Sequence, residues 1–215
     1  PKSSGSVNFW NTESEKMESI DELDDEGMRS FRRNMQMIFQ DPYESLNPRW
    51  TIKDIIKEPL DIHNIGALND REEAVIEILR TVGLTPPENY LARYPHEISG
   101  GQRQRVSIAR TLIMKPKFVI CDEPTSMLDV SIRISIMDLM LNLAKDLNVS
   151  YLYITHDLAV ARYMCNRIAV MFNGKIVEIA DTEELLNNPI HPYTKRLISS
   201  IPCLLYTSDA ADDIP

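Results

Sequence analysis

The segment Ser99-Gly100-Gly101-Gln102 has the residue types of an anion-binding helix N-terminus. Ser99 is a favourable N-cap, and the apolar spacing of residues 106–113 predicts a helix that begins directly after it. The first turn of such a helix exposes unpaired N–H groups and the positive end of the helix dipole, and the glycines let an anion approach closely. The residues alone leave two interpretations open: a phosphate contact, or a glycine-rich loop before a core helix.

A second group that could do chemistry is the pair of carboxylates Asp122 and Glu123, which follows the apolar run 118–121. Adjacent carboxylates at the end of a buried strand repel each other and lose hydration, so we expect a cation to compensate them. The alternative is that both acids lie at a helix N-terminus, where the helix dipole favours negative charge.

Gln40 and His156 occupy the same kind of position, because each follows an apolar run, 35–39 and 151–154 respectively. In a parallel sheet, ligands bind at the carboxyl ends of the strands. We therefore expect Gln40, Asp122-Glu123 and His156 to meet at one edge of a sheet. For His156 the alternative is a structural hydrogen bond without a catalytic role.

The elements that must position these residues alternate between strands and helices. The residue patterns predict strands at 7–10, 35–39, 118–121 and 149–154. They predict helices at 52–60, 132–146, 158–164 and 192–199, a helix after Asp181, and a helix that starts around Asp70 with Glu73 in a capping box. They also predict a hairpin with the turn Asn173-Gly174. Residues 13–26 are acidic and weakly patterned, which is typical of a solvated loop or surface helix. This order predicts an α/β fold with a largely parallel sheet, into which the mostly helical segment 43–115 is inserted.

Composition excludes several classes of protein. The chain has 215 residues, of which 43% are hydrophobic and 26% charged, as in an ordinary globular domain. Its net charge of -9 argues against a general nucleic-acid binder, and its apolar runs are shorter than the roughly 18–20 residues of a membrane span. Cys121, Cys165 and Cys203 follow no metal or disulfide spacing, which favours a reducing cytosol.

The string Ile98-Ser99-Gly100-Gly101-Gln102 resembles the signature motif of ATP-binding cassette (ABC) ATPases, in which leucine more often stands at the first position. The resemblance implies a P-loop NTPase-like α/β fold, with ATP and Mg²⁺ as cofactors. It makes Asp122 the Walker B carboxylate on the Mg²⁺ shell and Glu123 the residue that orients and deprotonates the attacking water.

The same resemblance assigns the other candidate residues. Gln40 matches the Q-loop glutamine near Mg²⁺ and the water, and His156 matches the switch histidine that contacts the γ-phosphate. The stretch Ser126-Met127-Leu128-Asp129 resembles the D-loop, which faces the partner subunit, although Met127 stands where the family commonly has alanine. In this family Ser99, Gly100, Gly101, Gln102 and Asp129 contribute to nucleotide binding across a dimer.

Two further stretches are similar to the importers of oligopeptides and dipeptides, and nickel and glutathione importers share them: Gln40-Asp41-Pro42 with Ser45-Leu46-Asn47-Pro48-Arg49, and His191-Pro192-Tyr193-Thr194-Lys195. The resemblance implies a second ATPase subunit packed head to tail, as a homodimer or heterodimer. It also implies two transmembrane permease subunits, contacted by segment 43–115, and indirectly an extracytoplasmic solute-binding protein. The ATPase would lie in the cytoplasm against the inner face of the membrane.

The P-loop string Gly-x-x-x-x-Gly-Lys-Ser/Thr does not occur in the sequence, where the one Gly-Lys pair is Gly174-Lys175 in the predicted hairpin. We therefore interpret residues 1–202 as a partial ABC ATPase domain that lacks its Walker A region, with a helical subdomain at 43–115 and a C-terminal extension at about 181–202. Residues 203–215 resemble a translated sequencing adaptor, so we expect a non-native tail that includes Cys203. We expect the 215-residue chain alone to be inactive as an ATPase.

Two other functions remain open from the sequence. A soluble ABC ATPase that acts on DNA or ribosomes would share the signature and Walker B residues, but it gives no reason for the importer-like stretches. A P-loop-free domain that only lends its signature motif to a partner would be an interaction module and not an enzyme. A Walker A string in frame upstream would exclude this second alternative.

Overall fold

The computed structural model describes residues 5–11 and 16–200. The chain divides into two compact units, residues 1–152 and residues 153–215. The predicted non-native tail at 203–215, with Cys203, lies outside the described residues.

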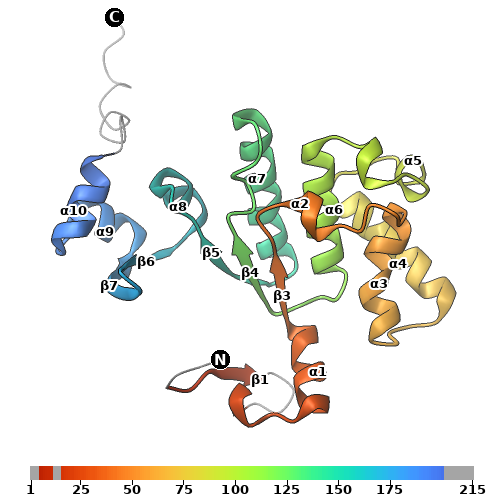
Figure 1. Ribbon diagram of the computed structural model, residues 1–215, viewed down its shortest axis with the longest axis horizontal. Coiled ribbons are helices and arrows are strands. Elements are labelled where there is room, and N and C mark those ends of the chain that lie inside the picture. Colours follow the sequence, from red (N-terminus) through yellow and green to blue (C-terminus); the bar gives the residue numbers. More distant parts are fainter. Residues whose placement is uncertain (1–4, 12–15, 201–215) are drawn as a thin grey trace, which may run out of the picture. The chain divides into compact units, whose positions relative to one another are not determined.

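The first unit contains the first two strands of the predicted parallel sheet, and the third strand begins just before the unit ends. Strands β3 (Met35–Ile38) and β4 (Phe118–Asp122) run parallel, with Ile38 opposite Cys121, and the strand order is β3-β4-β5, where β5 is Ser150–Ile154. Ile38 and Cys121 are fully buried, as the apolar runs predict. Figure 1 shows β3 and β4 side by side, with their carboxyl ends at the same edge.

The chain between β3 and β4 is mostly helical, as its apolar spacing predicts. The helices are α2 (Pro42–Ser45), α3 (Ile52–Ile62), α4 (Leu68–Thr81), α5 (Glu88–Leu91), the 3-10 turn η2 (Pro95–Glu97) and α6 (Gly100–Leu112). Helix α7 (Val130–Asp146) follows β4. Both α3 and α4 contact α6, which also contacts β3, so α6 joins the helical segment to the sheet. That segment 43–115 is a separate subdomain stays a prediction.

The N-terminal part corrects one expectation. Residues 16–19 were expected in a loop or surface helix, but they form strand β2 (Lys16–Ser19), antiparallel to β1 (Asn8–Asn11). The pairing with β1 supplies the hydrogen bonds that the weak local pattern does not indicate. Next come the 3-10 turn η1 (Ile20–Glu22) and helix α1 (Asp25–Asn34). Phe31 of α1 packs edge-to-face against Phe9, with 5.0 Å between the two ring centroids.

The start of α4 also differs from the expectation. The helix begins at Leu68 instead of near Asp70, and the Asp70 carboxylate accepts a hydrogen bond from the backbone N–H of Ala67 at 3.1 Å. Gly66 turns the chain with a φ of +73°, and Arg71 donates to the carbonyl of Ile65 at 2.9 Å. These contacts place Asp70 in the first turn, so the capping box predicted with Glu73 is wrong.

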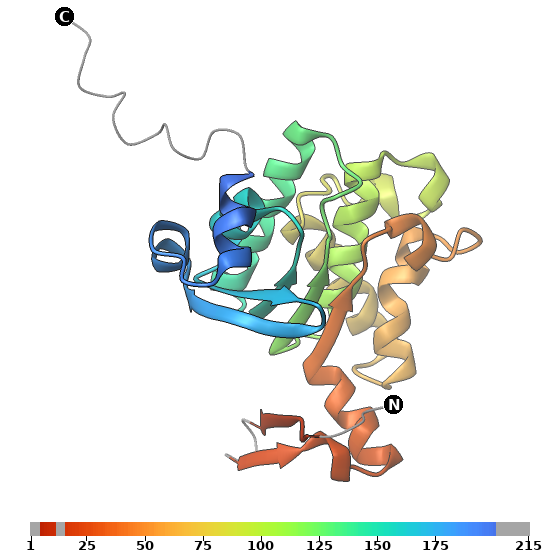
Figure 2. The ribbon, with the colours of Figure 1, turned by 60° about the vertical axis from the view of Figure 1, so that its left-hand side comes forward.

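The second unit is a hairpin with helices against it. Its elements are α8 (Leu158–Met164), β6 (Arg167–Phe172), β7 (Lys175–Asp181), α9 (Thr182–Asn187) and α10 (Pro192–Ser199). The antiparallel β6–β7 pair in Figure 2 confirms the predicted hairpin, and both turn residues, Asn173 and Gly174, have positive φ. Ala161, Ile168 and Leu185 form the buried centre of this unit.

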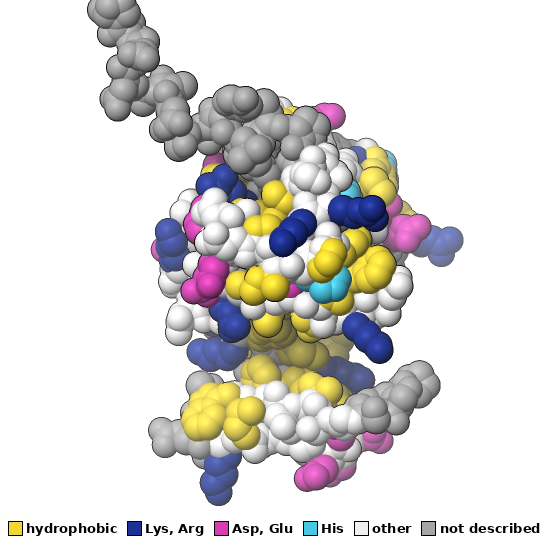
Figure 3. Space-filling model, turned by 90° about the vertical axis from the view of Figure 1, so that its left-hand side faces the viewer, with side chains coloured by type: hydrophobic (Ala, Val, Ile, Leu, Met, Phe, Trp, Pro, Cys, Tyr) yellow, Lys and Arg dark blue, Asp and Glu magenta, His cyan; other side chains and the backbone are white. Residues whose placement is uncertain are grey.

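The stretch beginning at His191 starts α10 and is fixed by one carboxylate. Glu178 of β7 accepts hydrogen bonds from the backbone N–H groups of Ile190 at 2.7 Å and His191 at 3.0 Å. The Thr194 side chain, ahead of these backbone N–H groups, lowers the pKa of Glu178. The space-filling view in Figure 3 shows hydrophobic side chains exposed among those of Lys and Arg. His191 is the N-cap of α10, where its Nδ1 accepts from the backbone N–H of Tyr193 at 3.1 Å, and Pro192 occupies the first helical position, which needs no N–H donor.

We predict that Ile108→Ala strongly destabilises the protein, because Ile108 is fully buried on α6. The expected loss in the free energy of unfolding is about 2–5 kcal/mol, as for other large cavities in a core. Urea unfolding measures it. The matched control is Ile134→Ala on α7, where 48% of the side chain is exposed, and a loss there as large as at position 108 would contradict the packing described.

We predict that the protein loses stability at high pH because of the buried hydroxyl of Tyr151. Its hydroxyl is buried and, within the described part of the chain, has no hydrogen-bond partner. Burial, with a smaller contribution from Cys121, raises the pKa of Tyr151, so the folded state keeps this proton after the unfolded chain has lost it. Stability should be fully present below about pH 10 and fall above it. Urea unfolding between about pH 8 and about pH 11 should show a shallower fall for Tyr151→Phe, and equal slopes would contradict the assignment.

Candidate nucleotide site

The structure brings Gln40 and Glu123 together at the carboxyl ends of β3 and β4. The Nε2 group of Gln40 donates a hydrogen bond to Oε2 of Glu123 at 3.1 Å. The two residues are far apart in the sequence, and the parallel pairing of their strands is what makes them neighbours. The expectation that these strands deliver polar groups to one edge holds for this pair.

Glu123 has an unusual backbone conformation. Its φ is +43°, in the left-handed region that non-glycine residues seldom adopt. The carbonyl of Glu123 accepts hydrogen bonds from the backbone N–H of Ser126 at 3.1 Å and from its hydroxyl at 3.0 Å, which hold the turn. Strain of this kind costs on the order of 1–3 kcal/mol and clusters at functional sites. The turn therefore fixes the carboxylate of Glu123 beside Gln40.

Asp122 is the last residue of β4 and is partly buried. Its carboxylate and the side-chain carbonyl of Gln40 are oxygen donors, which is the ligand type that Mg²⁺ prefers. Mg²⁺ is usually held by one or two carboxylates together with phosphate oxygens, and not by an all-protein cage. The donor set at this edge thus fits the ion, although the described residues contain no cluster of three or more metal-ligating side chains.

The N-terminus of α6 is built as the sequence predicts. Ser99 is the N-cap, its hydroxyl accepts from the backbone N–H of Gln102 at 3.3 Å, and the Gln102 carbonyl Oε1 accepts from the N–H of Ser99 at 3.0 Å. Nε2 of Gln102 donates to the hydroxyl of Tyr90 at 3.3 Å. Both polar atoms of the Gln102 side chain are therefore used inside the chain. The first-turn N–H groups of Gly100 and Gly101 have no intrahelical acceptor and are suited to an anion.

Gly100 and Gly101 differ in how much space the structure leaves for a side chain. A Cβ on Gly101 would lie 2.7 Å from Cγ2 of Ile132 on α7, closer than atoms can pack. A Cβ on Gly100 would meet nothing nearer than Cδ2 of Leu128 at 3.8 Å, an ordinary contact. Gly101 is thus required for α6 to approach α7, whereas the position of Gly100 tolerates a side chain.

Asp129 and His156 complete the predicted set. Asp129 is exposed and is the N-cap residue of α7 in the first unit. His156 is exposed and lies before α8 in the second unit, where Asp157 caps that helix by accepting from the N–H of Ala159 at 2.8 Å. Whether His156 shares the edge with the other residues stays a prediction.

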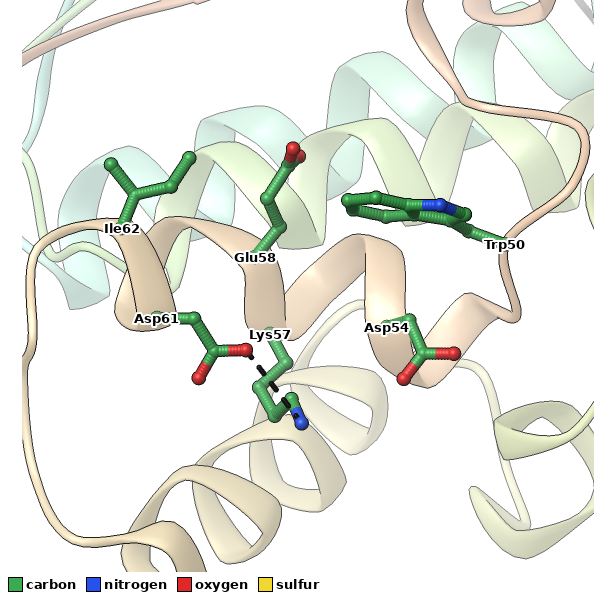
Figure 4. Close-up of a pocket in the computed structure, with 6 residues that line it drawn as sticks. All are labelled: Trp50, Asp54, Lys57, Glu58, Asp61 and Ile62. Atoms are coloured by element: carbon green, nitrogen blue, oxygen red, sulfur yellow. Dashed lines mark ion pairs between the residues drawn. The ribbon is translucent and has the colours of Figure 1, made fainter.

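A hollow of about 400 Å³ lies along α3, away from the predicted chemistry. We call it the α3 hollow, and it is lined by Trp50, Asp54, Lys57, Glu58, Asp61 and Ile62 (Figure 4). All three acids of the lining already have partners. Glu58 pairs with Arg110 at 2.7 Å, and Asp61 pairs with Arg71 at 2.7 Å and with Lys57 at 3.6 Å. Asp54 accepts from the hydroxyl of Thr51 at 2.6 Å. The hollow therefore offers the exposed apolar side chains of Trp50 and Ile62 for contact.

Comparison with known proteins identifies the family. The family model described as ABC transporter matches residues 2–126, more than half of the chain. The chain belongs to the ABC transporter family. The model described as the C-terminal region of oligopeptide/dipeptide transporters matches residues 177–213, which include most of β7 and all of α9 and α10.

Curated relatives of this ABC transporter chain have similar descriptions. It is 50% identical over 188 residues to the oligopeptide transport ATP-binding protein AppF of Bacillus subtilis. The aligned region covers 87% of this chain and 56% of AppF. It is 51% identical over 176 residues to the dipeptide transport ATP-binding protein DppF of Lactococcus lactis, covering 81% of this chain and 56% of DppF. The chain thus spans about half the length of these relatives.

Solved structures support the fold. The ATP-binding cassette MJ0796, in a dimeric post-hydrolysis state bound to ADP and Pi, aligns with a TM-score of 0.65 and 30% identity over 77% of this chain and 70% of that chain. The fold is the α/β fold of ABC ATPases, as the resemblance implied. Within the described residues, none of the helices combines the length and apolar character of a membrane span.

We predict different outcomes for substitutions at Gly100 and Gly101. Gly101→Ala should lower the free energy of unfolding by about 1–3 kcal/mol, because its Cβ overlaps with Ile132. Gly100→Ala should leave stability within about 0.5 kcal/mol of the parent, since its Cβ has room.

Thermal and urea unfolding measure both effects. Adding Ile132→Ala, which removes the clashing methyl group, should cost less in the Gly101→Ala background than in the parent. Equal costs in the two backgrounds, or equal destabilisation by both glycine variants, would be inconsistent with the packing of α6 on α7.

Proposed function

We propose that this chain is the major part of the ATP-binding and ATP-hydrolysing subunit of an ABC importer for peptides or similar small solutes. The observation that carries the proposal is the contact between Gln40 and Glu123 at the carboxyl ends of parallel strands, in a chain of the ABC transporter family. The proposal concerns a longer protein, since the relatives extend well beyond the part that this chain matches.

In this proposal Glu123 orients the attacking water and takes its proton, and Gln40 positions the Glu123 carboxylate. The hydrogen bond from the Gln40 amide, at 3.1 Å, would hold the Glu123 carboxylate in the orientation that this role requires. Asp122 would hold Mg²⁺, which supplies charge neutralisation on the phosphates when it is bound. His156 would donate to charge that develops on the γ-phosphate, as the neutral or charged imidazole can do.

The N-terminus of α6 would serve a nucleotide held by a second subunit. Ser99 can donate its hydroxyl proton while its oxygen accepts from Gln102, and the N–H groups of Gly100 and Gly101 add two more donors. Gln102 would act by holding Ser99 in place. Asp129, exposed at the start of α7, would face the partner. The head-to-tail arrangement comes from the family resemblance, and the dimeric state of MJ0796 with ADP and Pi is in line with it.

The substrate class and the other partners follow from the relatives. AppF and DppF are described as transport proteins for oligopeptides and dipeptides, and the match at residues 177–213 has the same description. We assign the α3 hollow of the helical segment 43–115 to the contact with two membrane permease subunits, because its exposed Trp50 and Ile62 offer apolar surface. A solute-binding protein would act indirectly, outside the membrane. The subunit would lie on the cytoplasmic face.

We predict that the 215-residue chain alone shows negligible ATPase activity, because its sequence has no P-loop to hold the β- and γ-phosphates. Phosphate release at saturating MgATP measures this, with Glu123→Gln as the matched variant. Steady turnover by the parent chain that Glu123→Gln abolishes would contradict the prediction.

A positive test of ATP hydrolysis takes the rest of the ATPase from AppF. AppF in which the matching 188-residue segment is replaced by that of this chain, called here the AppF chimera, should hydrolyse ATP. Glu123→Gln in the chimera should lower kcat by at least about a hundredfold while ATP binding persists. A folded chimera that binds ATP and keeps its turnover after this substitution would overturn the assignment of Glu123.

A further inference from the structure

Arg103 carries a charged side chain that is almost completely buried. It lies on the first turns of α6 with 7% of its surface exposed, and its Nη1 group donates to the backbone carbonyls of Ile98 at 2.8 Å and Pro95 at 3.0 Å. A buried guanidinium is unfavourable unless its N–H groups are hydrogen-bonded. The two carbonyls belong to the segment that leads into Ser99, so Arg103 fixes the backbone directly before Ser99.

Tyr43 covers the guanidinium of Arg103. The central guanidinium carbon lies 3.7 Å from the centroid of the Tyr43 ring, which is the geometry of a close cation–π contact. Tyr43 belongs to α2 and is itself 59% exposed, so the ring shields Arg103 while much of it faces solvent. Without the ring, water would compete for the guanidinium and weaken its hold on the two carbonyls.

A second arginine of α6 ties the other end of α2. Arg110 donates through Nη1 to the carbonyl of Ser45, the last residue of α2, at 3.4 Å. Its Nη2 group pairs with Glu58 of α3 at 2.7 Å, which fixes the guanidinium. Helix α6 therefore contacts α2 at both ends, and α2 cannot shift along α6 without losing one of these contacts.

These contacts link the two halves of the candidate site. Tyr43 lies three residues after Gln40, whose amide contacts Glu123, and Arg103 donates its own backbone N–H to the carbonyl of Ser99 at 2.9 Å. We propose that Arg103 and Tyr43 are positioning residues: Tyr43 seats Arg103, and Arg103 sets the geometry of the first turn of α6. The importance of that turn for nucleotide rests on the proposed function, whereas the contact itself does not.

Amide hydrogen exchange of the 215-residue chain without nucleotide tests the proposal. Tyr43→Leu removes the ring and should raise by about fivefold the exchange rates of the hydrogen-bonded N–H groups of Ser99, Gln102 and Arg103, a typical loss for a cation–π contact. Tyr43→Phe keeps the ring and should stay within about twofold of the parent. Exchange in α4 (Leu68–Thr81) reports on global stability and should not change.

The matched control is Glu44→Gln, an exposed neighbour of Tyr43 on α2, which should change nothing. In a double-mutant cycle, Tyr43→Leu should have no further effect in the Arg103→Met background, because both substitutions remove the same contact.

Two results would overturn the proposal. One is unchanged exchange at Ser99, Gln102 and Arg103 in Tyr43→Leu, or a rise that Tyr43→Phe shares or that spreads equally to α4. The other is an effect of Tyr43→Leu that persists in full in the Arg103→Met background. Since no nucleotide is present, either result is distinguishable from a failure of the AppF chimera to hydrolyse ATP.

Discussion

The structure of the candidate site depends on one constraint. The first turn of α6 must leave the N–H groups of Gly100 and Gly101 without an acceptor, although the same turn packs closely against α7. Ser99 and Gln102 satisfy each other in a capping box, which uses the amides of Ser99 and Gln102 and leaves those of Gly100 and Gly101. Gly101 lets α6 approach Ile132 on α7. The N–H groups of Gly100 and Gly101 are thus held in place by the packing of α6, and they would need no rearrangement to face the anion that we propose.

The second part of the site depends on the parallel pairing of β3 and β4. That pairing places Gln40 beside Glu123, and the turn at Ser126 holds Glu123 in its left-handed conformation. The loop that carries Gln40 continues directly into α2, which α6 contacts through Arg103 and Arg110. The sheet edge and the start of α6 are therefore joined by the chain between them, and each constrains the position of the other.

Local patterns explain why much of this could be predicted from the sequence. The Ser99 cap, the Asn173-Gly174 turn and the apolar strands all depend on neighbouring residues. Strand β2 and the start of α4 were missed, since the first needs its partner β1 and the second depends on the turn at Gly66. Arg103 was given no role, although it follows the signature directly, because its burial depends on Tyr43, which is distant in the sequence.

The central claim is that each nucleotide site combines the catalytic carboxylate of one subunit with the signature motif of the other. The most direct measurement mixes two inactive AppF chimeras, one with Ser99→Arg and one with Glu123→Gln. In a mixed dimer that shares its sites in this way, one site has both substitutions and the other has neither. The account predicts that mixing restores ATP hydrolysis that neither chimera shows alone. Mixed dimers that form and stay inactive would contradict it.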